Sequence, residues 1–158
     1  MTGSARFSPC RRYRYALWRS WGDPRPFGSP CAMFVCLNPS TADETQDDPT
    51  LRRCIAFTRA WGFSALCMTN LFAYRATDPA DMLAQADPVG EANDPTLRAT
   101  AKMAGVIIAA WGVHGSYLGR GAVVRAMLPK LHYLRLTKAG HPAHPLYLPR
   151  SLVPAAWS

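Results

Sequence analysis

The sequence predicts one α/β domain, a three-layer α/β/α sandwich built on a mainly parallel sheet. Short apolar segments alternate at least three times with segments of helical periodicity, the order typical of parallel sheets. The length of 158 residues suits a single compact domain, and the 49% hydrophobic content with 18% charged residues excludes an intrinsically disordered chain. We expect residues 1–12 to be a basic flexible tail and residues 13–158 to form the domain.

The expected strands begin at residues 13–21, an aromatic-rich segment that alternates roughly and is placed at a sheet edge. A loop rich in proline and glycine follows at residues 22–28. The other expected strands are continuous apolar runs, the pattern of strands that are buried on both faces. They comprise residues 31–37, 65–69, 106–111 and 131–136.

Two helices are expected to begin at an Asp-Pro-Thr sequence, in which aspartate caps the helix and proline occupies the first helical position. Asp48 begins the first, which ends at Gly62, and Asp94 begins the second, which runs to about Ala104. Four further segments complete the chain. They are a helical turn at 79–84, a glycine-rich loop at 112–121, a helix at 121–128 and an irregular segment at 137–158.

Charge is distributed unevenly along the chain, whose formal net charge is +8. All ten acidic residues lie between Asp23 and Asp94, whereas eight lysines and arginines follow Pro95 without an acidic residue among them. A basic surface attracts polyanions, so a nucleic acid or nucleotide is the expected partner. The alternative is that the charge serves only solubility.

The five cysteines, an odd number without a C-x-x-C pair, are expected to be free thiols in a reducing cytosol. Their spacing fits neither a metal nor an iron–sulfur site, so no cofactor is expected. The longest apolar stretch, residues 104–111, is too short to span a bilayer. No membrane association and no obligate protein partner are therefore expected.

Polar residues follow several expected strands, where ligands bind in open parallel sheets. Asn38, Pro39 and Ser40 follow one strand and Asn70 ends the next, and an amide at either position could position water or pair with a nucleobase edge. Asn38 could instead start a turn, as Asn-Pro sequences often do, and Asn70 could instead bond loose backbone groups. The other candidate ligand-binding residues are Trp111, for stacking, Lys138, His144 and Arg150.

Two further groups are candidates for catalysis. Asp43 and Asp47 belong to a cluster of four carboxylates in six residues, which could supply a general base or could be a solvated loop. His141 and His144 lie in a proline-rich loop after a strand, where an imidazole can donate to a developing anion. The chain lacks the glycine-rich phosphate-loop and dinucleotide-binding motifs and the G-x-S-x-G nucleophile motif.

Four runs of the chain form a distinctive set, LNPSTAD at residues 37–43, DDPTLRRC at 47–54, TNLFAYRATDP at 69–79 and TKAGHPAHPLYLP at 137–149. Together they resemble an uncharacterised bacterial family, domain of unknown function 1643. The resemblance spans about residues 13–157 and implies little about function, because that family is itself largely uncharacterised.

A more distant resemblance is to the uracil-DNA glycosylase superfamily, whose motifs occur in the same order. Residues 37–40 match its first motif, and the resemblance implies that Asn38 positions the attacking water. Residues 69–71 match a strand whose asparagine reads the flipped base, here Asn70. Residues 141–143 match the last motif, whose histidine, here His141, stabilises the leaving base.

The leading hypothesis is therefore an N-glycosidic bond hydrolase that acts on a nucleobase in DNA or in a modified nucleotide. Asp43 or Asp47 would assist Asn38 in orienting water, and Lys138 and Arg150 would hold phosphate. One alternative is a noncatalytic module that binds nucleotides or nucleic acid on the same surface. Another is a carboxylate-dependent phosphoryl-transfer enzyme that requires Mg²⁺.

Overall fold

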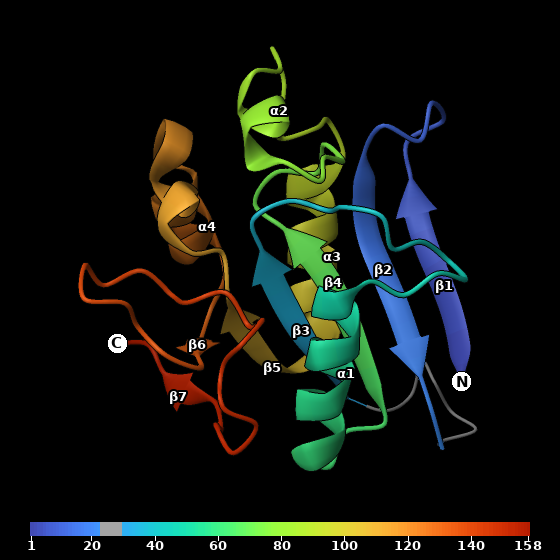
Figure 1. Cartoon of the computed structure of the whole chain (residues 1–158), viewed down its shortest axis with the longest axis vertical. Coiled ribbons are helices and arrows are strands. Elements are labelled where there is room, and N and C mark those ends of the chain that lie inside the picture. The colour runs from blue at the N-terminus through green and yellow to red at the C-terminus, as the bar shows by residue number, and fades with distance from the viewer. Residues whose placement is uncertain (23–29) are drawn as a thin grey trace.

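The computed structural model describes residues 1–22 and 30–158. These residues form an α/β architecture, a seven-stranded sheet of order β1-β2-β4-β3-β5-β6-β7 with four α-helices (Figure 1). The strands are β1 (Thr2–Phe7), β2 (Arg14–Ser20), β3 (Cys31–Cys36), β4 (Ala65–Asn70), β5 (Ala104–Ala109), β6 (Leu131–Tyr133) and β7 (Ala155–Ala156). The helices are α1 (Pro49–Ala60), α2 (Pro79–Leu83), α3 (Asn93–Met103) and α4 (Arg120–Met127), with a 3-10 helix η1 (Val113–Gly119).

The sheet is mixed, which corrects the prediction of a mainly parallel sheet. β3 pairs in parallel with β4 and β5, and β5 pairs in parallel with β6. The margins are antiparallel, because β2 pairs in that sense with β1 and β4, and β7 with β6. β1 and β2 are joined by a short turn, and a short turn can connect only antiparallel neighbours.

The N-terminal segment, expected to be a flexible tail, contains β1. Its pairing with β2 extends from Thr2 opposite Ser20 to Phe7 opposite Arg14. β2 is therefore an interior strand, and the sheet edge expected at residues 13–21 lies instead at β1. β1 is mostly exposed and lacks an apolar pattern, so only its hydrogen bonds to β2 make it a strand.

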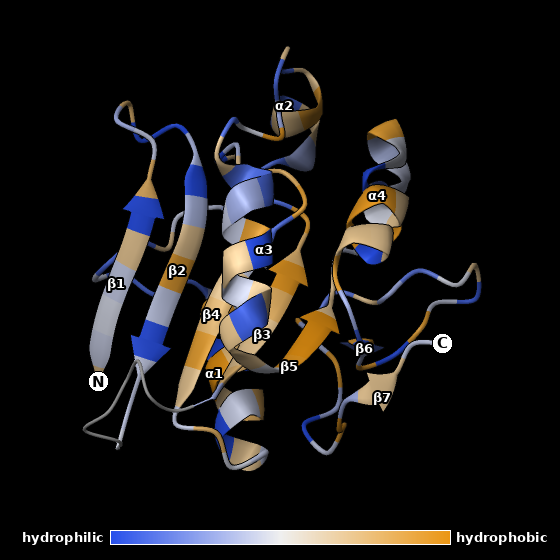
Figure 2. Ribbon diagram, turned by 180° about the vertical axis from the view of Figure 1, so that it is seen from behind, coloured by the Kyte–Doolittle hydropathy of each residue, from blue (hydrophilic) through white to orange (hydrophobic). Residues whose placement is uncertain are grey.

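The core lies on both faces of the sheet, because successive side chains of β3 point to opposite sides. Phe34 packs in one apolar cluster with Leu51 of α1. Val35 packs in a second cluster with Leu97 of α3 and Val124 of α4. Helix α1 thus covers one face and α3 and α4 cover the other, around central strands that are the most hydrophobic of the sheet (Figure 2).

Helix α1 begins as predicted and α3 does not. The Asp48 side chain caps α1, and Pro49 occupies its first position. Helix α3 starts two residues earlier than predicted, at Asn93 instead of Pro95, and has no side-chain cap. Asp94 lies within its first turn and forms an ion pair with Arg120, so this Asp-Pro-Thr sequence serves a tertiary contact instead of a cap.

The remaining predictions concern a loop, the cysteines and the possibility of a membrane-spanning helix. The proline- and glycine-rich loop predicted at residues 22–28 lies almost wholly outside the described residues. All five cysteines are free, and four of them are buried. Among the described residues, no helix has the length and apolar character needed to cross a membrane.

The connections after the parallel strands place polar loops at one end of the sheet. From β3 the chain crosses to β4 through α1 on one face, whereas from β5 it crosses to β6 through α4 on the other. β3 and β5 are neighbours, so their carboxyl ends flank a topological switch point, a place where open sheets bind ligands.

Candidate functional site

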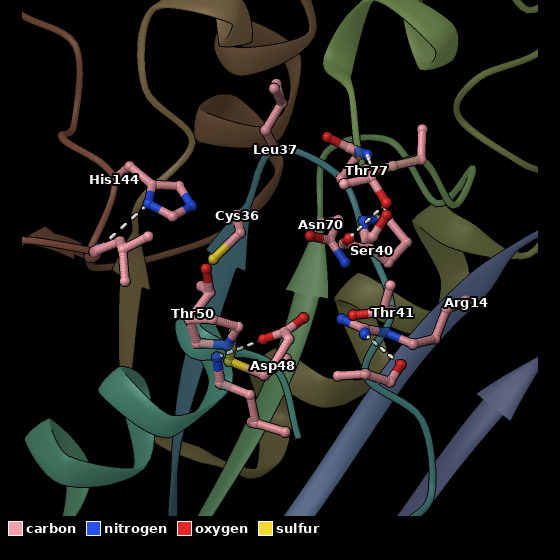
Figure 3. A pocket seen from close by; sticks show the side chains of 18 of the residues that line it. Arg14, Cys36, Leu37, Ser40, Thr41, Asp48, Thr50, Asn70, Thr77 and His144 are labelled. Atoms are coloured by element: carbon pink, nitrogen blue, oxygen red, sulfur yellow. Dashed lines mark hydrogen bonds between the residues drawn. The ribbon is translucent and has the colours of Figure 1, made fainter. Parts of the chain in front are cut away.

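A pocket of about 370 Å³ opens at the carboxyl end of β3 (Figure 3). Its walls come from five parts of the chain that are distant in sequence. They are Arg14 of β2, the loop 36–42 after β3, residues 48–51 at the start of α1, Asn70 with the loop that follows β4, and His144 with Leu146. The pocket therefore gathers Asn38, Pro39, Ser40, Asn70 and His144 of the predicted site.

The loops after β3 and β4 are tied to each other by hydrogen bonds. Nδ2 of Asn38 donates to the carbonyl oxygens of Pro39 at 3.1 Å and Ala76 at 2.9 Å. The Ala76 N–H donates to Pro39 O at 2.9 Å, and the hydroxyls of Ser40 and Thr77 lie 3.3 Å apart. The donor end of the Asn38 amide thus shapes the wall, and its side-chain carbonyl oxygen accepts no hydrogen bond from the described residues.

Asn70 presents a buried donor to the pocket. The residue is 2% exposed, and its Nδ2 has no hydrogen-bond partner among the described residues. A buried amide N–H without an acceptor costs free energy, so this group is poised for an acceptor that a ligand supplies. Asn70 is the last residue of β4, and its position follows from the strand.

Arg14 contributes a buried positive charge that sequence reasoning missed. Nη1 donates to the carbonyl oxygen of Ala42 at 2.9 Å, whereas Nε has no partner among the described residues. Burial lowers the pKa of Arg14 to about 10, so the guanidinium stays charged at neutral pH. The only feature of the sequence that could have indicated a role for Arg14 is its charge within an aromatic-rich strand.

Asp48 supplies the carboxylate of the pocket. One oxygen, Oδ1, accepts from the Leu51 N–H at 2.8 Å and so caps α1, and Figure 3 shows the second oxygen directed toward the space between Cys36 and Arg14. Asp48 and Arg14 both belong to the described part of the chain and form no ion pair. From the sequence, Asp48 was expected only to cap the helix.

His144 is exposed at the rim, and a hydrogen bond defines its tautomer. The Leu146 N–H donates to Nδ1 at 3.2 Å, so Nδ1 is the acceptor and the proton of the neutral ring lies on Nε2. Figure 3 shows that second ring nitrogen facing the pocket. Desolvation by the surrounding protein lowers the pKa of His144, which favours the neutral imidazole.

Cys36 is the thiol of the pocket wall and remains protonated. Burial raises its pKa to about 12, which outweighs the opposing effect of the Arg14 charge. Because the thiolate is the nucleophilic form, this raised pKa disfavours a nucleophilic role for Cys36 at neutral pH.

The two aspartates predicted to orient water serve the loop before α1 instead. Asp43 accepts from the backbone N–H groups of Thr45 and Gln46 at 2.9 and 2.8 Å, and these bonds lower its pKa. Asp47 pairs with the buried Arg19 at 3.0 Å. Neither lines the pocket, because Asp43 bonds within its own loop and Asp47 joins the loop to β2.

The other predicted residues also lie outside the pocket lining. His141 and Lys138 belong to a tight turn in which the Thr137 N–H donates to His141 O at 2.8 Å. Trp111 is 4% exposed and packs against Trp157 in the apolar core. Arg150 lines an adjacent groove, which shares Pro49 and Leu146 with the pocket. In the described part of the chain, no three His, Cys, Asp or Glu residues are grouped to hold a metal ion.

Comparison with known proteins identifies a family for the chain. The model of the family DUF1643, described as protein of unknown function, matches residues 14–146. No curated protein and no solved structure is significantly similar to the chain. The matched region contains every residue that lines the pocket, from Arg14 to Leu146. The chain therefore belongs to the DUF1643 family.

Proposed function

We propose that the pocket binds one nucleobase and hydrolyses its N-glycosidic bond. The observation that carries this proposal is the pairing of two donors in one pocket, the unpartnered Nδ2 of Asn70 and the Nε2–H of His144. A nucleobase has acceptor atoms on its edge and becomes an anion when it leaves the sugar. These donors match both properties.

Recognition of the base rests on the carboxamide of Asn70. An amide offers a donor and an acceptor side by side, which matches the edge of a nucleobase. The pocket volume of about 370 Å³ is in the range of sites for small ligands. The carbonyl oxygen of Asn38 adds an acceptor on the neighbouring wall.

The reaction breaks the bond between C1′ of the sugar and the base nitrogen, and the bonding electron pair leaves with the base. The sugar passes through an oxocarbenium-like state, as in other glycoside hydrolysis. Asp48 accepts a proton from the attacking water while the water oxygen forms a bond to C1′. His144 donates a hydrogen bond from Nε2 to the base anion, which then takes up the proton released from the water.

We further infer a distant relationship to the uracil-DNA glycosylase superfamily, including its three-layer sandwich fold. The positions of Asn38 and Asn70 after neighbouring parallel strands support this relationship. The imidazole assigned to the leaving base is then His144 in place of His141, and the water-orienting carboxylate is Asp48 in place of Asp43 or Asp47. A cytosolic location belongs to the same proposal and is supported by the free cysteines.

The test measures release of free base by chromatography. The substrates are nucleosides, nucleotides and single-stranded oligonucleotides that carry normal, deaminated or alkylated bases. We expect the wild-type protein to release one class of base and His144→Gln to lose that activity, whereas His141→Gln, the matched control, retains it. Equal activity of the two variants, or no release from any substrate by the wild type, contradicts the proposal.

The second candidate function is noncatalytic binding of a nucleotide or nucleic acid in the same pocket. One observation favours it. The Asn38 donor and one Asp48 oxygen already form hydrogen bonds within the fold, which leaves fewer groups for catalysis. Calorimetry would measure nucleotide binding by the wild type and by Asn70→Asp. Binding that Asn70→Asp abolishes, together with no base release by the wild type, would support this alternative.

A further inference from the structure

The first feature that leads beyond the pocket is an arginine groove on its β1–β2 side. Arg11, Arg12 and Arg75 line this groove of about 420 Å³, which shares Ser40 and its neighbouring loop residues with the pocket. Arg11 is paired with Glu44 at 2.7 Å. Arg12 and Arg75 form no ion pair with any described residue, so they carry the uncompensated charge of the groove.

A second arginine groove adjoins the pocket along α1. Arg52, Arg53 and Arg150 line it, in a volume of about 290 Å³, and it shares Pro49 and Leu146 with the pocket. The Nε of Arg53 is shielded from solvent and has no hydrogen-bond partner among the described residues. This groove therefore contains a buried donor in need of an acceptor as well as exposed charge.

The two grooves lie on opposite sides of the pocket. Figure 3 shows Ser40, Thr41 and Thr77, which border the first groove, across the pocket from His144 and Thr50 on the α1 side. Neither groove is lined by an Asp or Glu among the described residues. A continuous path thus runs from one set of arginines, over the pocket, to the other.

We propose that this path binds a single strand of nucleic acid, with a phosphate in each groove and the intervening base in the pocket. The inference rests on the proposed function only in assigning one nucleobase to the pocket. A strand places phosphates on both sides of each base, and arginine pairs with phosphate oxygens in a planar, bidentate geometry. A free nucleotide has phosphate on one side and leaves one groove empty.

Tyr147 adds a stacking surface beside the second groove. Tyr147 is 91% exposed, and its backbone has a φ of 72°, a conformation that residues other than glycine rarely adopt. A base next to the pocket-bound one can stack on this ring, which contributes affinity without sequence preference.

The test compares binding of a fluorescent single-stranded DNA of roughly ten nucleotides, the length that single-strand sites accommodate, with binding of the four deoxynucleoside monophosphates. Affinity is measured by anisotropy over a range of salt concentrations. We expect the strand to bind more tightly than any mononucleotide. Arg12→Gln and Arg150→Gln should each reduce the slope of log affinity against log salt by about 0.7, and the double variant should reduce it by the sum of the two.

The matched control is Arg98→Gln, which removes the same charge from an exposed position on α3, outside both grooves. Its slope should equal that of the wild type. Tyr147→Ala should weaken binding of the strand without a change in slope. An RNA strand and a DNA duplex of the same sequence show which nucleic acid is preferred, and tighter binding of the duplex than of the single strand contradicts the proposal.

Equal slopes for Arg12→Gln, Arg150→Gln and Arg98→Gln would overturn the strand path. The hydrolase proposal fails separately. Strand binding that depends on both grooves, without base release, supports the path and rejects the hydrolase. Base release from a free nucleotide at a rate that both groove variants preserve supports the hydrolase and rejects the path.

Discussion

Asn93 holds the backbone of Asn70 from behind the pocket, since its Nδ2 donates to the Asn70 carbonyl oxygen across 3.0 Å. The same nitrogen donates to the carbonyl oxygen of Leu71 at 3.0 Å, which also accepts from Nε of Arg120 at 2.9 Å. Arg120 is in turn paired with Asp94. A buried polar network on one face of the sheet thus fixes the strand end whose amide lies in the pocket.

Replacement of Asn93 by alanine tests this network. The change leaves the buried Asn70 carbonyl oxygen without its donor, so we expect the free energy of unfolding to fall by about 1 to 3 kcal/mol. Urea denaturation measures the loss. Arg98→Gln, on the exposed face of the same helix, should leave the unfolding midpoint unchanged, and an equal effect of the two variants contradicts the assignment.

Two substitutions at Asp48 separate its capping role from its proposed chemical role. Asp48→Ala should lower stability by about 1 kcal/mol because α1 loses its cap, whereas Asp48→Asn keeps the cap and should leave stability nearly unchanged. Both variants remove the carboxylate and should abolish base release. Thermal unfolding and product analysis give the two readouts, and full activity of Asp48→Asn would show that the carboxylate is not the base.

The pH dependence follows from the state of His144. Its pKa is lowered by desolvation, so the folded protein prefers the neutral ring, and the donor Nε2–H and acceptor Nδ1 persist to a pH below the usual histidine range. Protonation of Nδ1 breaks the hydrogen bond from the Leu146 N–H that orients the ring, so base release should fall as the pH decreases through this lowered pKa. The fold should lose the corresponding stability over the same acidic range, because the unfolded chain binds the proton more readily.

A pH profile of base release and of unfolding checks both effects. His144→Gln should remove the histidine contribution to the pH dependence of unfolding, while His141→Gln should retain it. If the free energy of unfolding decreases equally with falling pH in the wild type and in His144→Gln, the assignment is contradicted.

Arg14 should show opposite effects on stability and binding. Among the described residues, the buried Arg14 charge makes a single hydrogen bond, which is costly, and an apolar side chain of similar volume often replaces such a charge without loss of stability. We therefore expect Arg14→Met to unfold at the same or a higher temperature than the wild type. Calorimetry should show that it no longer binds the nucleotide, and retained affinity would mean that Arg14 does not face the ligand.

The sequence predicted the parts of the fold that depend on local pattern. The apolar runs predicted β3, β4, β5 and β6, and the Asp48 cap predicted α1, because buried strands and helix caps require particular residue types. β1 has no such sequence pattern, since it is a strand only because it pairs with β2. The second Asp-Pro-Thr sequence was misleading because Asp94 is used by Arg120, a contact between distant segments.

The candidate site was predicted in the same uneven way. Asn38 and Asn70 come together because the carboxyl ends of adjacent parallel strands share one edge of the sheet. The choice between His141 and His144 could not be predicted, because an irregular proline-rich loop has no periodicity that tells which side chain points inward. Arg14 was missed for a related reason, since it lies in a strand with bulky side chains on both faces.

The N-terminal strand has a consequence for the behaviour of the isolated protein. β1 covers the hydrogen-bonding edge of β2, and its Phe7 ring lies beneath the guanidinium groups of Arg11 and Arg75, at 3.8 and 4.8 Å from the ring centroid. Loss of residues 2–7 would leave β2 free to pair with another chain. Truncation at this end would therefore cause self-association and loosen two arginines in a single step.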